Sequence, residues 1–422
     1  MSGAKVRIGL VGCGGMGRGH LNTFKKIEEG EVVGVADPSP QSREKVAKEF
    51  NLPVFETPGE LIEATRPDGC VIASPHPAHL ANALECFKRG VPVFTEKPMA
   101  SKISEAEAMI AAAKKARLML AVMFQFRGNI ATRRAKEILD AGTIGDIRRV
   151  NMVHVGLRSN TYYKICPWRG TWQNEGGGVL INQSPHTLDR AIYLAGMPSK
   201  VLARTWTYGH PIETEDQAEA LLTYPNGATG YMFMSTAEAP ATNRLEISGD
   251  RGRVVIDDDN GKLLLGKLPD SCKNFLATSD QEWASLKAEW TEVDLTPRPG
   301  EETGHIVCLR DFCQALRDKR QPMVVGEDGK RSLELANAIA FSSFQGAEVT
   351  LPLGRKAYDE MYSFGCAKGG GRSLQQLIPL WRKLAASPAK KAAGKPARKA
   401  AKAAKKPVGK AKGKKSKAGK GR

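Results

Sequence analysis

The chain has 422 residues, of which 41% are apolar and 26% are charged, so it is long enough for two domains with a sizeable core. No apolar run approaches the roughly 20 residues that cross a bilayer, and the first residues lack a signal-peptide pattern, so we expect a cytoplasmic protein without membrane segments. The net charge of +18 is uneven, because residues 385–422 hold 15 Lys or Arg and no acid, and subtracting these 15 leaves +3 for residues 1–384.

The first part of the chain alternates short apolar strands with helices. Such strands, each apolar along its whole length, are typical of a parallel sheet that helices cover on both faces. We therefore predict a Rossmann domain over residues 1–127. In chain order it reads as strand, turn and helix over 5–27, strand over 31–40, helix over 42–50, strand, turn and helix over 67–90, strand end over 92–100, helix over 104–116 and strand over 118–127.

A glycine motif follows the first expected strand and opens a helix. Gly12, Gly14 and Gly17 match the GxGxxG pattern, which allows a tight turn and brings the helix N-terminus to a pyrophosphate. Asp37 lies 20 residues after Gly17, at the end of the second strand, where a carboxylate accepts hydrogen bonds from ribose hydroxyls and repels a 2′-phosphate. The pattern predicts NAD as the cofactor, with NADP as the alternative because Ser39 and Arg43 are near.

The sequence TEKPMA places Glu96, Lys97 and Pro98 at the carboxyl end of a later strand. Ligands of parallel sheets bind at that edge. A lysine beside a nicotinamide ring can hold the substrate hydroxyl and lower its pKa. The alternative is a surface lysine that pairs with Glu96.

The pattern changes after residue 127 to longer strands of alternating polarity. We expect a helix over 129–142 and strands within 147–157, 199–209, 217–237, 243–258 and 261–266, with hairpin turns at YPNGA and SGDRG. Two helices and a closing strand follow within 305–353. These elements predict an α/β domain over 128–355 with an open, mostly antiparallel sheet, then a helical extension over 356–384 and a disordered tail over 385–422.

A polar helix is expected where GGGVLINQSPHTLDRA spans residues 176–191. If the run is one helix, Asn182, His186 and Asp189 share one face. The preceding TYYKICPWRGTW supplies Tyr163, Trp168 and Arg169, which suit a sugar ring; packing under the sheet is the alternative for the aromatic residues. For Asp189 the alternative is an ion pair with a nearby arginine.

These motifs in this order resemble the Gfo/Idh/MocA oxidoreductase family, typified by glucose–fructose oxidoreductase and inositol dehydrogenase. The resemblance covers roughly residues 4–355 and rests on GLVGCGGMGRGHL, ASPHPAHLANALECFKRGVPVFTEKP, FQFR, GTIGDIRRV, WRGTW, GGGVLINQSPHTLD and VVGEDGKRSLELANAIAFSS. It implies hydride transfer between a nicotinamide and a carbohydrate or polyol carbon. It also implies a homodimer or homotetramer built on the open sheet.

The resemblance also implies the roles of individual residues. Lys97 and His186 are implied in catalysis. The implied cofactor-binding residues are Gly12, Gly14, Gly15, Met16, Gly17, Asp37, Ser74, Pro75, His79, Glu96, Lys97 and Gln125. The expected substrate-binding residues are Arg127, Tyr163, Trp168, Arg169, Asn182 and Asp189.

The chain departs from the polyol dehydrogenases of that family at Asn182, where they carry Asp four residues before the histidine. Asn can orient a sugar hydroxyl but cannot act as a base, which argues against an Asp-assisted proton relay and against inositol as the substrate. We expect His186 to act as general base and Lys97 to stabilise the oxygen, or the two to exchange roles.

The sequence is compatible with three functions. The first is an NAD(P)-dependent dehydrogenase or reductase of a sugar, sugar acid or sugar derivative. The second is a glycosidase of the same fold that keeps its NAD bound. The third is a non-catalytic NAD-binding regulator that the basic tail tethers to nucleic acid.

The C-terminal tail is strongly basic and lacks acidic residues. Residues 385–422 resemble the Lys/Ala/Pro tails of linker histones and lack large apolar side chains, so we expect disorder and either nonspecific nucleic acid or polyanion binding or a merely solubilising role. Eight scattered cysteines with no CxxC pair predict reduced thiols. His76 and His79 form HxxH without an acidic partner, so no metal is expected.

Overall fold

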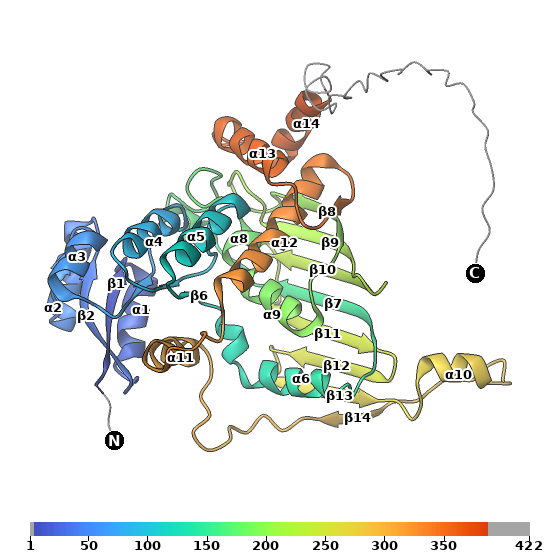
Figure 1. Cartoon of the computed structure of the whole chain (residues 1–422). Coiled ribbons are helices and arrows are strands. Elements are labelled where there is room, and N and C mark those ends of the chain that lie inside the picture. The colour runs from blue at the N-terminus through green and yellow to red at the C-terminus, as the bar shows by residue number, and fades with distance from the viewer. Residues whose placement is uncertain (1–3, 387–422) are drawn as a thin grey trace, which may run out of the picture. The chain divides into compact units, whose positions relative to one another are not determined.

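The computed structural model describes residues 4–386, so the predicted basic tail lies, but for its first two residues, outside the described residues. The described residues as far as Arg382 belong to one compact unit that contains two sheets (Figure 1). Among residues 4–386, every helix is too short or too polar to cross a membrane.

The first sheet is parallel, six-stranded and ordered β3-β2-β1-β4-β5-β6, as the alternation of strands and helices predicts. From β1 the chain first adds strands on one side, β2 and β3, and then on the other, β4 to β6. This change of direction at β1 opens a crevice at the carboxyl ends of the strands. The strands are β1 (Val6–Val11), β2 (Gly30–Ala36), β3 (Val54–Phe55), β4 (Gly69–Ile72), β5 (Val93–Thr95) and β6 (Leu120–Val122). The helices are α1 (Gly15–Phe24), α2 (Pro40–Phe50), α3 (Pro58–Thr65), α4 (His79–Lys88) and α5 (Ile103–Ala116), with 3-10 turns η1 (His76–Ala78) and η2 (Gln125–Gly128).

The second sheet has nine strands in the order β14-β13-β12-β11-β7-β10-β9-β8-β15. All of its pairs are antiparallel except β7 with β10, so the expected mostly antiparallel sheet is confirmed. The expected hairpins join β9 to β10 and β11 to β12. The strands are β7 (Ile147–Val155), β8 (Lys200–Trp206), β9 (Gln217–Thr223), β10 (Thr229–Ser235), β11 (Thr242–Gly249), β12 (Gly252–Asp257), β13 (Lys262–Lys267), β14 (Glu289–Glu292) and β15 (Val349–Thr350).

One face of this second sheet is covered by helices α9 (Pro185–Ala195) and α12 (Gly326–Gln345), as Figure 1 shows. α12 also reaches the first sheet, because Gly329 lies where a Cβ atom would meet Val122 at 2.8 Å. At its other end, Ser342 and Ser343 accept hydrogen bonds from backbone N–H groups of β8 at 2.9 Å. This buried helix therefore ties the two sheets together.

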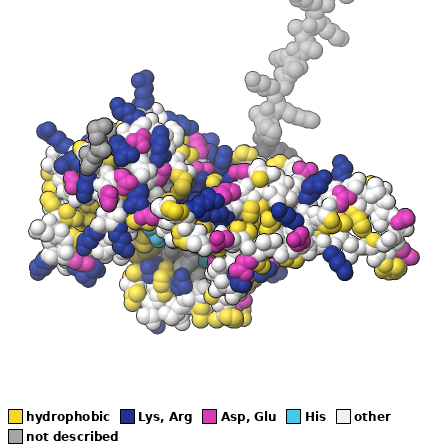
Figure 2. Space-filling view, turned by 90° about the horizontal axis from the view of Figure 1, so that it is seen from below, with side chains coloured by type: hydrophobic (Ala, Val, Ile, Leu, Met, Phe, Trp, Pro, Cys, Tyr) yellow, Lys and Arg dark blue, Asp and Glu magenta, His cyan; other side chains and the backbone are white. Residues whose placement is uncertain are grey.

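The opposite face of the second sheet is open. Leu202, Leu221 and Tyr231 are cross-strand neighbours there and stay 44%, 57% and 38% exposed. Their register makes an apolar stripe across β8, β9 and β10. Figure 2 shows basic and acidic side chains intermixed over the described surface in that view, as the small net charge of residues 1–384 predicts.

Helix α11 (His305–Asp318) packs on the first sheet although it follows the second along the chain. Its Phe312 ring lies 5.3 Å from that of Phe94 in β5, and a Cβ atom on Gly30 would meet Cys313 at 2.6 Å. Phe312 and Cys313 of α11 both belong to the hydrophobic core of the first sheet, as does Phe94. The chain therefore crosses back to the first sheet before α12.

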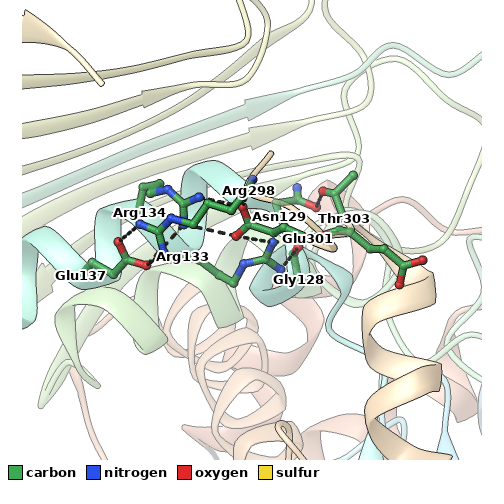
Figure 3. Close-up of polar contacts among 9 residues, drawn as sticks. Gly128, Asn129, Arg133, Arg134, Glu137, Arg298, Glu301 and Thr303 are labelled. Atoms are coloured by element: carbon green, nitrogen blue, oxygen red, sulfur yellow. Dashed lines mark hydrogen bonds and ion pairs between the residues drawn. The ribbon is translucent and has the colours of Figure 1, made fainter. Parts of the chain in front are cut away.

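The segment that carries the chain back is fixed by an ion network, drawn in Figure 3. Glu301 accepts hydrogen bonds from Arg133 and Arg134 of helix α6 (Ile130–Asp140) at 2.6–3.2 Å. Arg298 in turn donates to Glu137 at 3.0 and 3.1 Å. Residues 298–303 are thereby held against α6, immediately before α11 begins.

The structure corrects two expectations about helices. The run 176–191 is two helices, α8 (Val179–Asn182) and α9, because Pro185 begins α9 and the chain between them makes a turn. Asn182 therefore does not share a helix face with His186 and Asp189. The extension after residue 355 has two helices, α13 (Arg355–Lys368) and α14 (Leu374–Ala385), where only the second was expected. The short helices α7 (Asn160–Lys164) and α10 (Cys272–Thr278) were also not expected.

Candidate active site

A cavity of about 560 Å³ lies at the carboxyl ends of β1, β2, β4 and β5. This is the crevice that a doubly wound sheet offers to a dinucleotide. Its walls include Gly12, Gly14, Gly15, Met16, Asp37, Ser74, Pro75, His76, His79, Glu96, Lys97, Cys166, Trp168, Arg169 and Asn182.

The glycine turn after β1 is shaped for close approach of a ligand. A Cβ atom at Gly12, where φ is +93°, would lie 2.7 Å from the backbone of Ala73, and one at Gly17 would lie 2.1 Å from the carbonyl oxygen of Gly12. At Gly14 and Gly15 a Cβ atom would meet nothing within 4 Å. Open space therefore lies in front of the α1 N-terminus, where backbone N–H groups can face a pyrophosphate.

Asp37 is held at the end of β2 by the turns on either side. Its two carboxylate oxygens accept from the backbone N–H groups of Cys13 and Ser39, both at 2.9 Å. Arg43 donates to the carbonyl oxygen of Asp37 at 2.7 Å. The carboxylate is thereby fixed at the cavity wall, where ribose hydroxyls can reach its remaining lone pairs.

His79 joins the loops that follow β4 and β5. Its buried ring lies between the carbonyl oxygens of Ser74 and Pro98, at 2.8 and 2.9 Å from its two nitrogens. Burial lowers the pKa of His79. We therefore read His79 as a group that holds the Ser74 and Lys97 loops at a fixed separation.

Glu96 and Lys97 point to different partners, so the pairing of Lys97 with Glu96 is not the arrangement found. Glu96 is buried and contacts His20 at 2.8 Å. Burial opposes its ionisation, but the hydrogen bond and charge of His20 outweigh that effect and lower the pKa of Glu96 to about 2. Lys97 donates from Nζ to the carbonyl oxygen of Asn182 at 2.7 Å. Burial lowers the pKa of Lys97, and the nearby Glu96 and Glu175 oppose that shift.

Gly178, the last of three glycines before α8, lets the backbone rest on Glu215. A Cβ atom at Gly178 would lie 1.8 Å from the Glu215 carbonyl oxygen. The carboxyl of Glu215 accepts from Gly178 and Leu180 N–H groups at 2.8 and 3.2 Å. This buried carboxyl holds the start of α8 and so carries Asn182, at the end of that helix, to Lys97.

His186, the second predicted catalytic residue, is 8% exposed, packs against aromatic rings and is not part of the cavity wall. Its ring centre lies 5.3 Å from that of Phe126 and 6.1 Å from that of Phe124. Nδ1 is buried without a hydrogen-bond partner among the described residues. Burial, followed by the charge of Lys97, lowers the pKa of His186 well below its usual value. The imidazole is therefore neutral near pH 7, the form that accepts a proton.

Arg127 and Asp189 bind each other and lie outside the cavity lining. Arg127 donates from Nε and Nη2 to the two oxygens of Asp189 at 2.9 and 2.7 Å, and a third nitrogen lies 3.1 Å from Asp328. Both side chains are buried. For Asp189 the structure thus shows the ion pair that was the alternative to hydroxyl binding.

The aromatic and cationic residues of the WRGTW region divide between the cavity and the core. Trp168 and Arg169 line the cavity, whereas Tyr163 and Gln125 are not part of its wall. The Tyr163 hydroxyl contacts Thr236 at 3.1 Å, and its ring packs 4.7 Å from that of His210. For Tyr163 the structure shows packing.

The sequence reasoning missed Glu175, which is 1% exposed behind the cavity wall. Its carboxyl accepts from Gly170 N–H at 2.5 Å and from the side-chain amide of Asn182. The sign available in the sequence was an acid directly before a glycine run that packs closely. Groups of His, Cys, Asp and Glu suited to a metal ion are not found among residues 4–386.

Two family models match this chain. Residues 6–124 match the oxidoreductase family with an NAD-binding Rossmann fold, named GFO_IDH_MocA, and residues 132–255 match the GFO/IDH/MocA C-terminal domain. Together these stretches take in more than half of the 422 residues.

Curated relatives match over most of their length. The scyllo-inositol 2-dehydrogenase (NAD(+)) of Bacillus subtilis is 25% identical over 85% of this chain and 99% of its own. The D-apiose dehydrogenase of Paraburkholderia graminis is 24% identical over 81% of this chain and 88% of its own.

Solved structures of the same fold include the WlbA dehydrogenase of Bordetella pertussis in complex with NADH and UDP-GlcNAcA. It has a TM-score of 0.70 and 27% identity, over 83% of this chain and all of the other. A levoglucosan dehydrogenase in complex with NADH has a TM-score of 0.71 at 22% identity, over 83% of this chain and all of its own, and shares the fold.

Proposed function

This chain belongs to the GFO/IDH/MocA family of NAD-binding oxidoreductases, and from that premise we propose that it oxidises or reduces a sugar acid or another anionic sugar derivative. It is an NAD-dependent dehydrogenase of sugar-type substrates. The observation that carries the finer proposal is the cavity itself, with a glycine turn and Asp37 on one side and Lys97, Arg169 and Asn182 on the other.

The residues around the glycine turn fit NAD. The open space before Gly14 and Gly15 suits a pyrophosphate, and Asp37 suits the adenosine ribose. A 2′-phosphate would meet the Asp37 carboxylate, and Arg43 is already bound to the Asp37 carbonyl oxygen. These contacts favour NAD over NADP.

The chemistry needs a hydride acceptor, a proton acceptor and a group that stabilises the oxygen. A nicotinamide dinucleotide held by the glycine turn and Asp37 would supply the hydride acceptor or donor. Neutral His186 accepts the hydroxyl proton, and the Lys97 ammonium stabilises the developing negative charge on the substrate oxygen. The exchange of these two roles is the alternative assignment.

An anionic substrate is supported by the charges at the Lys97 side of the cavity. Arg169 stacks 3.8 Å above the Tyr162 ring and donates to the Tyr162 carbonyl oxygen at 2.9 Å. No described carboxylate forms an ion pair with this guanidinium, which lines the cavity. A fixed arginine with free donors suits a carboxylate or phosphate group.

The test is a panel of matched neutral sugars and their uronic acids, each offered with NAD and with NADP and followed by the absorbance of the reduced cofactor. We expect turnover with NAD and a kcat/KM at least about 10-fold higher for the acid of the preferred pair. R169A should remove that preference while R169K keeps part of it. Equal rates for acids and neutral sugars would contradict the anionic substrate, and release of an aglycone without net NADH would indicate a glycosidase.

Self-association through the open sheet face is also proposed. The stripe of Leu202, Leu221 and Tyr231 is apolar, exposed and continuous across three strands, which is typical of an interface. L221E should turn a homodimer or homotetramer into a smaller species by light scattering. An unchanged mass for that variant, or a monomeric parent protein, would contradict the proposal.

The basic tail and the cysteines support two further proposals. The composition of residues 385–422 supports salt-sensitive binding to nucleic acid, which deletion of these residues should abolish in a mobility-shift assay. The absence of a mobility shift for the intact protein at low salt would contradict this proposal.

All eight cysteines are free thiols, which supports a reducing, cytoplasmic location.

A further inference from the structure

Glu175 lies directly behind the cavity wall with each carboxylate oxygen bound to a donor. One oxygen accepts from the backbone N–H group of Gly170 at 2.5 Å. The other accepts from Nδ2 of Asn182. Because the first donor belongs to the backbone, it cannot turn to suit another partner, and the carboxylate must keep its second acceptor toward Asn182.

This contact decides which end of the Asn182 amide meets a ligand. Nδ2 is directed to Glu175 and to the Tyr162 hydroxyl, which lies 3.3 Å away. Oδ1 accepts no hydrogen bond within the described part of the chain, and Asn182 lines the cavity. Next to it, Lys97 Nζ is bound to the main-chain oxygen of the same residue at 2.7 Å. A hydrogen-bond acceptor and a cation are therefore presented side by side.

We propose that Glu175 is a positioning residue of the hydride-transfer site, which turns the Asn182 amide so that its Oδ1 accepts a hydroxyl of the substrate. The inference rests on the proposed function, since it needs a polyhydroxy substrate beside Lys97. Glu175 itself is 1% exposed and does not touch the substrate. It acts through Asn182, and the chain thereby keeps an acceptor at this position without a charge in direct contact with the substrate.

The variant E175Q keeps the size of the side chain but removes one acceptor oxygen and the negative charge. A glutamine has one acceptor oxygen, which Gly170 N–H requires, so its NH₂ group faces Asn182 and the Asn182 amide turns over to receive it. Nδ2 then faces the cavity, where the substrate hydroxyl needs an acceptor. We expect KM for the sugar substrate to rise about 10- to 100-fold, with KM for NAD within about twofold of the parent value.

The double variant E175Q/N182D separates positioning from a merely structural role. An aspartate at position 182 accepts from the introduced glutamine with one oxygen and keeps the other toward the cavity, with the total charge unchanged. We expect it to return to within about threefold of the parent kcat/KM. N182D alone brings two carboxylates together and should be weaker than the double variant.

The matched control is E213Q. Glu213 also accepts from two backbone N–H groups, those of Trp172 and Gly371, but lies outside the cavity lining. It should leave both KM values within about twofold.

Each outcome has a defined meaning. A sugar KM for E175Q within about twofold of the parent value, or a double variant as poor as E175Q, overturns the role of Glu175 while the proposed function stands. A parent enzyme that turns over no compound of the panel overturns the proposed function and this inference together. If E175Q alone is poorly folded, the double variant still decides, because recovery requires the exchanged acceptor pattern.

Discussion

Two hydrogen-bonded carboxyls, Glu175 behind the cavity and Glu301 in the segment against α6, show opposite responses to their surroundings. Glu301 accepts from the Arg134 side chain, from the Arg298 backbone N–H and from Arg133, and these contacts lower its pKa to about 2 (Figure 3). Glu175 is buried, and burial outweighs its hydrogen bonds to Gly170 and Asn182 and raises its pKa to about 7.

The difference lies in the balance between removal of water and supply of positive charge. Near α6 the guanidinium groups contact the carboxylate directly and water still reaches it, so the ion pairs hold a segment in place. Behind the cavity, water is excluded and the cations Lys97 and Arg169 face the ligand space. The charge of the Glu175 carboxylate is therefore only partly compensated, and ionisable groups with pKa values shifted in this way are typical of active sites.

The strongest way to test this contrast is to remove the two residues proposed to do the chemistry, Lys97 in the cavity wall and His186, which is not part of that wall. K97A and H186A should each lower kcat by about 10²- to 10⁴-fold because each removes a proton acceptor or the charge that stabilises the oxygen. Binding of NAD, measured by fluorescence titration, should persist in both. A near-parental kcat in either variant would rule out the role assigned to that residue.

A large loss of stability, instead of activity, is expected from the buried pair of Arg127 and Asp189. D189N leaves the guanidinium without its bidentate partner, which should lower the free energy of unfolding by about 3–5 kcal/mol. Urea unfolding followed by circular dichroism measures this. A loss below about 1 kcal/mol would show that Asp328 alone satisfies Arg127.

The titration of Glu175 predicts an intermediate effect on pH dependence. Because its pKa is about 7, the carboxylate that orients Asn182 forms as pH rises through neutrality, in the field of Lys97, Arg169 and Glu215. We expect kcat/KM to rise about 10-fold from pH 6 to pH 8. His186 has a pKa well below 6.5 and is already neutral in this range. E175Q should lack this rise. If the pH profile of kcat/KM for E175Q is identical to that of the parent enzyme, a group other than Glu175 causes the rise.

The smallest effect is expected at Glu301. Its folded-state pKa lies below the usual 4.5, so its contribution to stability is present above pH 4.5 and lost as pH falls through about 2. E301Q should therefore lower Tm by only a few degrees at pH 7 and leave kcat unchanged, since its ion pairs are partly exposed. For Glu175 the sign is reversed, because its raised pKa makes its contribution full below pH 4.5 and lost as pH rises through about 7. A loss of kcat in E301Q would link the segment to the cavity.

The amino-acid sequence by itself determined the parallel sheet, the glycine turn, Asp37, the Glu96–Lys97 strand end and the mostly antiparallel second sheet. Each of these depends on local periodicity or on short motifs, whose backbone requirements are met within a few residues. Cofactor type follows from the same motifs, because the carboxyl ends of neighbouring strands necessarily meet at one edge.

Only the tertiary structure decided how the polar residues that follow β6 along the chain were used. Arg127 and Asp189 pair across 62 positions of sequence, Tyr163 is packed against His210, and α11 returns to the first sheet. The break after Asn182 turned a predicted helix face into a contact between Asn182, Lys97 and Glu175. Such contacts depend on which distant groups meet and how completely water is excluded around them, and these quantities exist only once the chain is folded.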